Sequence, residues 1–203
     1  MMSMTEAAGF ALAVVMVVCS IRELHWSWPL AIVSSALYFV VFRGSQLYGE
    51  ASLQVVFAVL ALWGWRQWLQ QVPAAAPQTP ADAAPVDTLA PTPSHTGISR
   101  LSPRGRWHAL VASLLLWPLV ALFLRRFTDT DVPWWDGFTT ALSLVGQYLL
   151  GRKFIENWAV WLVVNTVSIG LFAYKGLWLT VLLYGIFAVM SVIGWRTWQR
   201  QIH

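Results

Sequence analysis

The sequence predicts an all-α integral membrane protein with seven transmembrane helices, arranged as two parallel three-helix repeats joined by one linking helix. Three observations predict this fold class. Hydrophobic residues make up 58% of the chain and charged residues only 11%, whereas soluble domains carry about 25% charged residues. Seven apolar stretches approach the ~20 residues that a helix needs to cross a bilayer. The pattern Gly-Trp-Arg-x-Trp occurs twice, at residues 64–68 and 194–198.

The first three apolar stretches form the first predicted repeat, residues 7–69. The stretch at 7–21 is short, so we expect residues at the membrane interface to complete its span. No positively charged segment precedes it and no small-residue cleavage site follows it, which favours a membrane helix over a cleaved signal peptide. The seven stretches lie at residues 7–21, 26–43, 51–69, 107–124, 137–151, 157–174 and 176–194.

A segment rich in proline and alanine follows the first repeat. Residues 72–96 hold six prolines and almost no large apolar side chain, so this segment has little to bury in a core. We predict a disordered cytoplasmic linker over residues 70–106. The linking helix follows at 107–124, and the second three-helix repeat occupies residues 125–199.

Basic residues are distributed unequally over the two ends of the predicted spans. Nine lie on the side of the C-terminus and four on the other side. Because Lys and Arg concentrate in cytoplasmic loops, we expect the N-terminus outside and the C-terminus in the cytoplasm. The nine are Arg22, Arg66, Arg100, Arg104, Arg106, Arg152, Lys153, Arg196 and Arg200, and the four are Arg43, Arg125, Arg126 and Lys175.

The two Gly-Trp-Arg-x-Trp motifs each close the third span of a predicted repeat. A basic residue followed by glycine precedes both, at Arg43-Gly44 and Lys175-Gly176, but the segment from Gly44 to Gly64 is longer than the segment from Gly176 to Gly194. This spacing indicates a small gap between the copies. We interpret the motif tryptophans as anchors at the lipid headgroups, with a gate as the alternative role. They are Trp65, Trp68, Trp195 and Trp198.

Parallel repeats imply transport. Three spans is an odd number, so the linking helix is what makes the two repeats parallel. Two parallel three-helix units with one crossover helix resemble the layout of SWEET sugar transporters. In such architectures the substrate site lies between the repeats near the middle of the membrane.

Several function classes lack the residues that they need. The histidines are scattered without metal-ligand spacing, and Cys19 is the single cysteine, so we expect no metal, cofactor or enzymatic site. The chain has no nucleotide-binding lysine in a glycine-rich loop. All nine Asp and Glu residues fall in loops or at span ends, which favours a uniporter over a proton-coupled carrier. The dispersed basic residues do not form a patch for nucleic acid.

Five stretches resemble the PnuC family of vitamin transporters, and RKFIENWAVWLVVN at 152–165 is the most specific run within them. The stretches are WPLAIVSSALY (28–38), QLYGEASLQVVF (46–57), ALWGWRQW (61–68), WWDGFTTALSLVGQYLLGRKFIENWAVWLVVNTVSI (134–169) and LYGIFAVMSVIGWRTW (183–198). The resemblance implies a SWEET-like core that carries nicotinamide riboside, an NAD precursor, across a bacterial inner membrane by facilitated diffusion. It also implies a functional link to a cytoplasmic kinase that phosphorylates the arriving substrate. Relatives carry thiamine or riboflavin, and the residues leave the vitamin and the oligomeric state open, a homo-oligomer included.

Aromatic and amide side chains within the spans are the candidate substrate-binding residues. Trp158, Trp161 and Asn165 recur at helical spacing and form one stripe. An indole face suits a vitamin ring, and an amide in a membrane span is costly unless it faces protein or a water-lined cavity. The other candidates are Gln147, Gln54, Tyr38, Tyr184 and Trp28, the last at the register of Trp158 or Trp161.

Each candidate also has a structural interpretation. The amides could hydrogen-bond to neighbouring helices, and the tyrosines and Trp28 could belong to the interfacial aromatic belt. A membrane scaffold or channel without transport is therefore the competing function. A polar stripe beside a cavity favours the transporter, and a stripe packed dry against its neighbours favours the scaffold.

Overall fold

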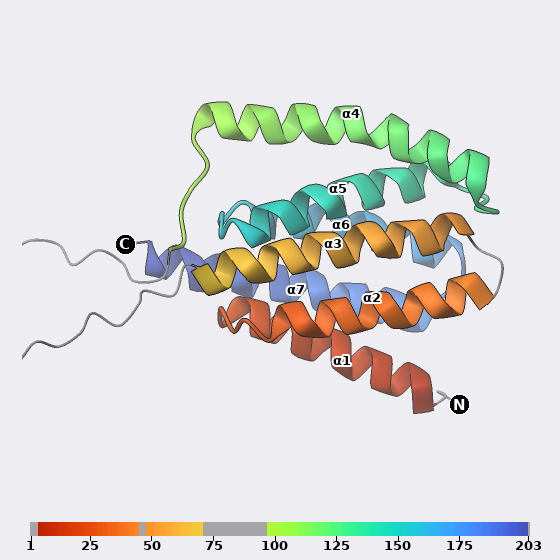
Figure 1. The fold of residues 1–203 in the computed structure, drawn as a ribbon, viewed down its shortest axis with the longest axis horizontal. Coiled ribbons are helices and arrows are strands. Elements are labelled where there is room, and N and C mark those ends of the chain that lie inside the picture. The colour runs from red at the N-terminus through yellow and green to blue at the C-terminus, as the bar shows by residue number, and fades with distance from the viewer. Residues whose placement is uncertain (1–3, 45–47, 71–96, 203) are drawn as a thin grey trace, which may run out of the picture.

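The computed structural model describes residues 4–44, 48–70 and 97–202. These residues form seven helices and no sheet (Figure 1), one helix for each of the seven predicted apolar stretches and in the same order. The helices are α1 (Met4–Ile21), α2 (Ser27–Gly44), α3 (Tyr48–Gln70), α4 (Pro103–Phe127), α5 (Pro133–Gly151), α6 (Asn157–Tyr174) and α7 (Trp178–Gln201).

Six of the seven helices form a closed ring. Going round it, α1 packs on α2, α2 on α3, α3 on α5, α5 on α6, α6 on α7, and α7 returns to α1. Among the described residues α1 has no contact with α3, and α5 has none with α7. The three helices of each predicted repeat therefore form an open row rather than a separate bundle, and α4 lies outside the ring against α5 and α3.

The helices alternate in direction along the bundle, and its two ends are distinct. We call the end where α3 stops and α4 starts the linker end, and the opposite end the far end. The C-terminus lies at the linker end and α1 begins at the far end (Figure 1). α1 runs in the same direction as α5, α2 as α6, and α3 as α7.

The ring helices of the two rows correspond at one constant sequence offset. α2 spans Ser27–Gly44 and α6 spans Asn157–Tyr174, so their first residues and their last residues are separated by the same number of positions. Glu23 and Lys153, in the turns that precede these helices, are 130 positions apart and have this same separation. We call two residues at this separation equivalent.

This correspondence corrects the gap that the glycine spacing indicated. Gly44 ends α2, whereas Gly176 lies beyond the end of α6, so the two glycines are not equivalent and the predicted gap is wrong. Trp28 is consequently equivalent to Trp158 and not to Trp161.

A cluster of tryptophans fills the core at the linker end. Trp68 and Trp198 are buried, with 3% and 0% of their surface exposed, and their ring centroids lie 6.5 Å apart. The Trp68 Nε1 donates to the Leu150 carbonyl and the Trp198 Nε1 to the Ile21 carbonyl, each at 3.1 Å. The prediction that these two side chains anchor the protein at lipid headgroups is wrong, because their N–H groups satisfy carbonyls at the ends of α5 and α1 instead.

The motif glycines make room for this cluster. A Cβ on Gly64 would lie 2.3 Å from the Trp28 ring, and a Cβ on Gly194 would lie 2.6 Å from the Trp158 ring. Trp28 meets Trp68 edge to face at 5.5 Å, and Trp158 meets Trp198 in the same way at 5.4 Å. Glycine is therefore required in both motifs because an indole occupies the space of a side chain.

Part of the segment predicted as a disordered linker, residues 70–106, has defined structure, because residues 97–106 contact the core or begin a helix. Residues 71–96 lie outside the described residues. Ser99 pairs with the α5–α6 turn, its N–H donating to Lys153 and its carbonyl accepting from Ile155, and Ile98 joins the buried core. Because the Ser102 side chain accepts from the Gly105 N–H and Pro103 starts the helix, α4 begins at 103 rather than 107.

The outer surfaces of the ring and of α4 are apolar. Many large hydrophobic side chains are more than half exposed, among them Val40, Leu119 and Leu182, and hydrocarbon tails of a bilayer would cover them. By length and hydropathy, α4, α6 and α7 qualify as membrane-spanning, with shorter apolar helices at Ala11–Ile21 and Ser27–Val40, among the described residues.

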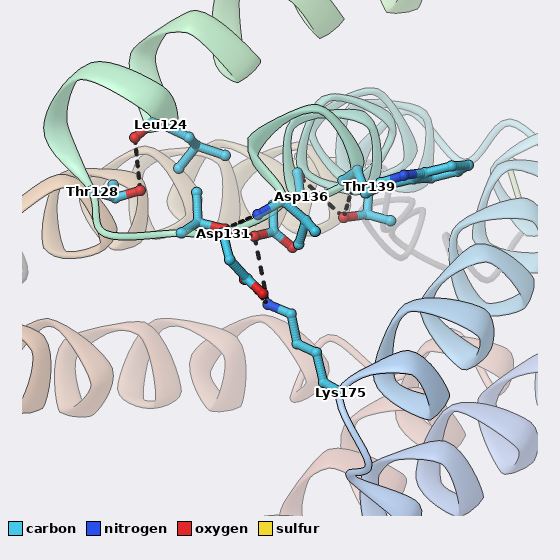
Figure 2. A network of polar contacts seen from close by, with 9 residues as sticks. Leu124, Thr128, Asp131, Asp136, Thr139 and Lys175 are labelled. Atoms are coloured by element: carbon cyan, nitrogen blue, oxygen red, sulfur yellow. Dashed lines mark hydrogen bonds and ion pairs between the residues drawn. The ribbon is translucent and has the colours of Figure 1, made fainter.

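Polar contacts join two connections at the far end. Figure 2 shows Lys175 of the α6–α7 turn reaching Asp131 of the α4–α5 connection, with 3.3 Å between Nζ and Oδ1. Asp136, in the first turn of α5, accepts a hydrogen bond from the Thr130 hydroxyl. Asp131 is 67% exposed, so solvent screens this ion pair.

Candidate functional site

A cavity of about 280 Å³ lies inside the ring, and all six ring helices line it. Binding pockets for small ligands range from roughly 300 Å³ upward, so this volume lies at the lower limit of that range and favours a small ligand. Trp28, Leu150 and Trp158 contribute to its wall at the linker end, where the tryptophan cluster continues behind them. The equivalent residues Phe57 and Phe187 line it from α3 and α7.

Six of the eight predicted site residues line this cavity. They are Trp28, Gln147, Trp158, Trp161, Asn165 and Tyr184. Gln54 and Tyr38 do not, and 51% of the Tyr38 surface is exposed. Gln54 is equivalent to Tyr184, so the corresponding place in the second half holds a cavity-lining tyrosine.

Asn165 is held in place by a chain of hydrogen bonds between α6 and α7. Its Nδ2 donates to the Ser191 hydroxyl at 3.2 Å, and that hydroxyl donates to the Phe187 carbonyl at 2.8 Å. Asn165 is 4% exposed. The hydrogen bond that Nδ2 donates therefore fixes the orientation of the amide. The Asn165 Oδ1 has no partner among the described residues, so it can accept a hydrogen bond from a ligand.

Trp161 lies one helical turn before Asn165 and is only half-buried. A Cβ on Gly146 of α5 would lie 3.3 Å from its ring, so the glycine lets the indole lie close to α5. The equivalent residue in the first half is Ala31, which also lines the cavity. The wall of the cavity thus carries a large indole from α6 and only a methyl group at the equivalent position of α2.

Serine hydroxyls are the functional groups that the sequence reasoning missed. Ser35 is equivalent to Asn165, and both line the cavity. The constant offset between the two halves would have identified Ser35 from the sequence, because it makes Ser35 the equivalent of the predicted site residue Asn165. The serines that line the cavity are Ser20, Ser27, Ser34, Ser35, Ser143 and Ser191.

The cavity carries no formal charge. Among the described residues that line it, none is Asp, Glu, Lys, Arg or His. No group of three His, Cys, Asp or Glu residues suitable for a metal occurs in the described part of the chain. Aromatic faces, amides and hydroxyls are thus the chemical means by which these side chains can bind a ligand.

A second cavity, of about 900 Å³, lies between α3, α4 and α5. Its wall is mainly aliphatic, and among the described residues it includes no Trp, Asn or Gln. Of these two cavities, the one inside the ring therefore combines aromatic faces with amides.

Comparisons with known proteins agree with this geometry. A sequence model of the family described as "Nicotinamide mononucleotide transporter" matches residues 3–200. The nicotinamide riboside transporter PnuC of Escherichia coli is 24% identical over 97% of this chain and 85% of its own length. The riboflavin/roseoflavin transporter RibM of Streptomyces davaonensis is 26% identical over 96% of this chain and 84% of its own length.

A solved structure has the same fold. The crystal structure of the vitamin B3 transporter PnuC superposes with a TM-score of 0.68 over 95% of this chain and 79% of that chain, at 22% identity. The family match covers nearly the whole sequence, including both tryptophan motifs and every residue that lines the cavity inside the ring. This chain therefore belongs to the nicotinamide mononucleotide transporter family, the PnuC family of membrane transporters.

Proposed function

We propose that this protein carries nicotinamide riboside across the bacterial inner membrane by facilitated diffusion. The single observation that supports this substrate best is the uncharged cavity with Trp161 and Asn165 on its wall. A pyridinium ring is planar and positively charged, so an indole face attracts it by stacking and by a cation–π interaction of roughly 0.5–2 kcal/mol. Asn165 Oδ1 would accept a hydrogen bond from the carboxamide or the ribose.

The uncharged lining of the cavity favours a nucleoside over a nucleotide. A phosphate monoester carries up to two negative charges, and burying it without Arg, Lys or a metal would be very costly. Among the described residues, no Arg or Lys lines the cavity. Nicotinamide mononucleotide, after which the family is called, is therefore a poor substrate in our proposal, whereas its dephosphorylated form fits.

We further propose that residues 7–69 and 125–199 are parallel repeats that move against each other, with 107–124 as the linking helix. The supporting observation is the constant offset between ring helices that run in the same direction. The basic residues favour a cytoplasmic linker end and an external N-terminus. Among the described residues, no acid lines the cavity to couple a proton, so net uptake would depend on a cytoplasmic kinase that traps the substrate.

The proposed binding site is completed by four further residues that line the same cavity, Trp28, Trp158, Gln147 and Tyr184.

Riboflavin is the second candidate substrate, since a relative at 26% identity is a riboflavin/roseoflavin transporter. Its three fused rings need more room than one pyridinium ring, and a cavity of about 280 Å³ favours the smaller vitamin. Thiamine remains a third candidate from the family resemblance.

The test is uptake into proteoliposomes that contain only this protein. Labelled nicotinamide riboside should enter until its internal and external concentrations are equal, and neither a proton nor a sodium gradient should raise that level. Encapsulating a nicotinamide riboside kinase with ATP should then permit accumulation. Uphill accumulation without the kinase would contradict facilitated diffusion, and absence of any uptake would favour a scaffold.

A further inference from the structure

Two charged residues occupy equivalent turns at the linker end. Glu23 lies between α1 and α2, and Lys153 lies between α5 and α6. Both adopt a φ of 54°, a left-handed conformation that residues other than glycine rarely adopt. Both turns therefore bear a conformational cost that glycine would avoid.

Glu23 and Lys153 bind each other across the two halves of the ring. Their Oε2 and Nζ atoms lie 2.8 Å apart, and the two side chains are only 14% and 10% exposed. The Lys153 ammonium also lies 5.0 Å from the centre of the Trp68 ring, within the range of a cation–π interaction. The pair is therefore partly desolvated and lies against the tryptophan cluster.

The other contacts around this pair also join opposite halves. The Trp68 indole of α3 donates to Leu150 of α5, and the Trp198 indole of α7 donates to Ile21 of α1. Trp68 and Trp198 face each other between the halves. A path from the cavity to the linker end has to separate these contacts, because they lie directly behind the cavity wall formed by Trp28 and Trp158.

We propose that the Glu23–Lys153 ion pair is the latch that keeps the cavity closed at the linker end. This inference rests on the proposed transport function. A buried ion pair gains little over apolar packing while it is formed, but its charges are well solvated when it opens, which suits a contact that must break in every cycle. In the ion pair at the far end, Asp131 is 67% exposed and Lys175 is 28% exposed, and Lys175 has no cation–π contact among the described residues, so the two ends are closed by different means.

Accessibility of the cavity tests the latch without any substrate. Ser34 lines the cavity, so Ser34→Cys in a Cys19→Ala background reports access by a membrane-impermeant thiol reagent that is added from the linker side of membrane vesicles. Glu23→Gln and Lys153→Gln should each raise the labelling rate by about tenfold or more through a shift toward the open state. The matched variant Lys175→Gln at the far end should leave the rate unchanged.

A control separates opening from general loosening of the fold. Ala141 is fully buried, away from the cavity, in α5, and Ala141→Cys should stay unlabelled in the same latch variants. Labelling of Ser34→Cys at the parental rate in both latch variants would overturn the proposal, and so would an equal increase at Ala141→Cys.

Cross-linking gives an independent test if neutralised variants do not fold. Glu23→Cys/Lys153→Cys in the Cys19→Ala background, joined by a short bifunctional thiol reagent that is cleavable by reduction, should stop substrate exchange in proteoliposomes, and reduction should restore it. Exchange at the unlinked rate while the link is intact would overturn the latch. If the unlinked protein does not exchange nicotinamide riboside at all, the proposed substrate fails, and the labelling experiment still decides the latch.

Discussion

Trp161 and Asn165 are the residues on which the proposed binding depends most. Asn165 offers its Oδ1 to a ligand while Ser191 holds its Nδ2, and losing one buried partner of a hydrogen bond costs about 1–3 kcal/mol. Losing the indole face should cost a similar amount. Trp161→Ala and Asn165→Ala should therefore each weaken nicotinamide riboside binding by roughly 10- to 100-fold in a calorimetric titration.

Trp178→Ala is the matched control for these two variants. Trp178 is 69% exposed at the start of α7, at the far end, so its removal should leave the affinity unchanged. Parental affinity in folded Trp161→Ala and Asn165→Ala proteins would mean that the α6 stripe only packs the helix. Ser35 and Gln147, which line the same cavity, would then be the next residues to substitute.

The motif glycines lead to a prediction about stability. Gly64→Ala and Gly194→Ala would place a methyl group against the Trp28 and Trp158 rings, and overpacking of this kind costs about 1–3 kcal/mol. Both variants should melt at a lower temperature in detergent. A Cβ at Gly185 would have no neighbouring atom within 4 Å. Gly185→Ala should therefore keep or raise the melting temperature, since alanine favours the helix. Equal melting temperatures for all three variants would show that the tryptophan rings can move to accommodate the added methyl group.

Single residues show where sequence reasoning reaches its limit. The α6 stripe could be predicted because helical spacing alone puts Trp161 and Asn165 on one face. The burial of Trp68 and Trp198 could not, because a tryptophan near a span end has the same local sequence whether it faces lipid or a neighbouring helix. Only the packing of α3 on α5 and of α7 on α1 decides between these two environments.

At the scale of helices, the cavity is asymmetric across otherwise equivalent rows. Ala31 of α2 and Trp161 of α6 are equivalent and both line the cavity, so one row supplies the aromatic face and the other supplies space. Ala31→Trp should fill that space and reduce nicotinamide riboside binding by at least about tenfold, a loss of roughly 1.4 kcal/mol, while the protein still folds. The loss would reflect steric exclusion rather than a lost contact.

The control for this variant is Val33→Trp. Val33 is 54% exposed on the same helix, and a tryptophan there should face the bilayer and leave the titration unchanged. If Ala31→Trp binds as tightly as the parent, the ligand does not lie between α2 and α6.

Most helix bounds were predictable to within four residues, because apolar stretches of membrane-spanning length are a strong signal, but α7 continues to Gln201 rather than ending at 194. The correspondence between the helices of the two rows was harder to predict from the sequence. Aligning Gly44 with Gly176 indicated a gap, whereas the helices correspond at a constant offset. The glycines misled because Gly44 ends a helix and Gly176 lies in a turn at a φ of 71°, two different structural reasons for the same residue type.

For the whole molecule, the distribution of basic residues predicts a cytoplasmic linker and C-terminus. Ser94→Cys in a Cys19→Ala background should resist a membrane-impermeant thiol reagent in intact cells and react once the membrane is permeabilised. Thr130→Cys, in the connection at the far end, should show the reverse and react in intact cells. Ready labelling of Ser94→Cys from outside would place the latch end of the molecule at the cell exterior.

Selectivity between a nucleoside and its phosphate tests the account of the cavity most directly. Purified protein should be titrated with nicotinamide riboside, nicotinamide mononucleotide, riboflavin and thiamine under the same conditions. An uncharged wall of indoles, amides and hydroxyls predicts that nicotinamide riboside binds most tightly and that its phosphate binds at least about 100-fold more weakly, because the phosphate would be buried without a counter-charge. Equal or tighter binding of nicotinamide mononucleotide would contradict the account.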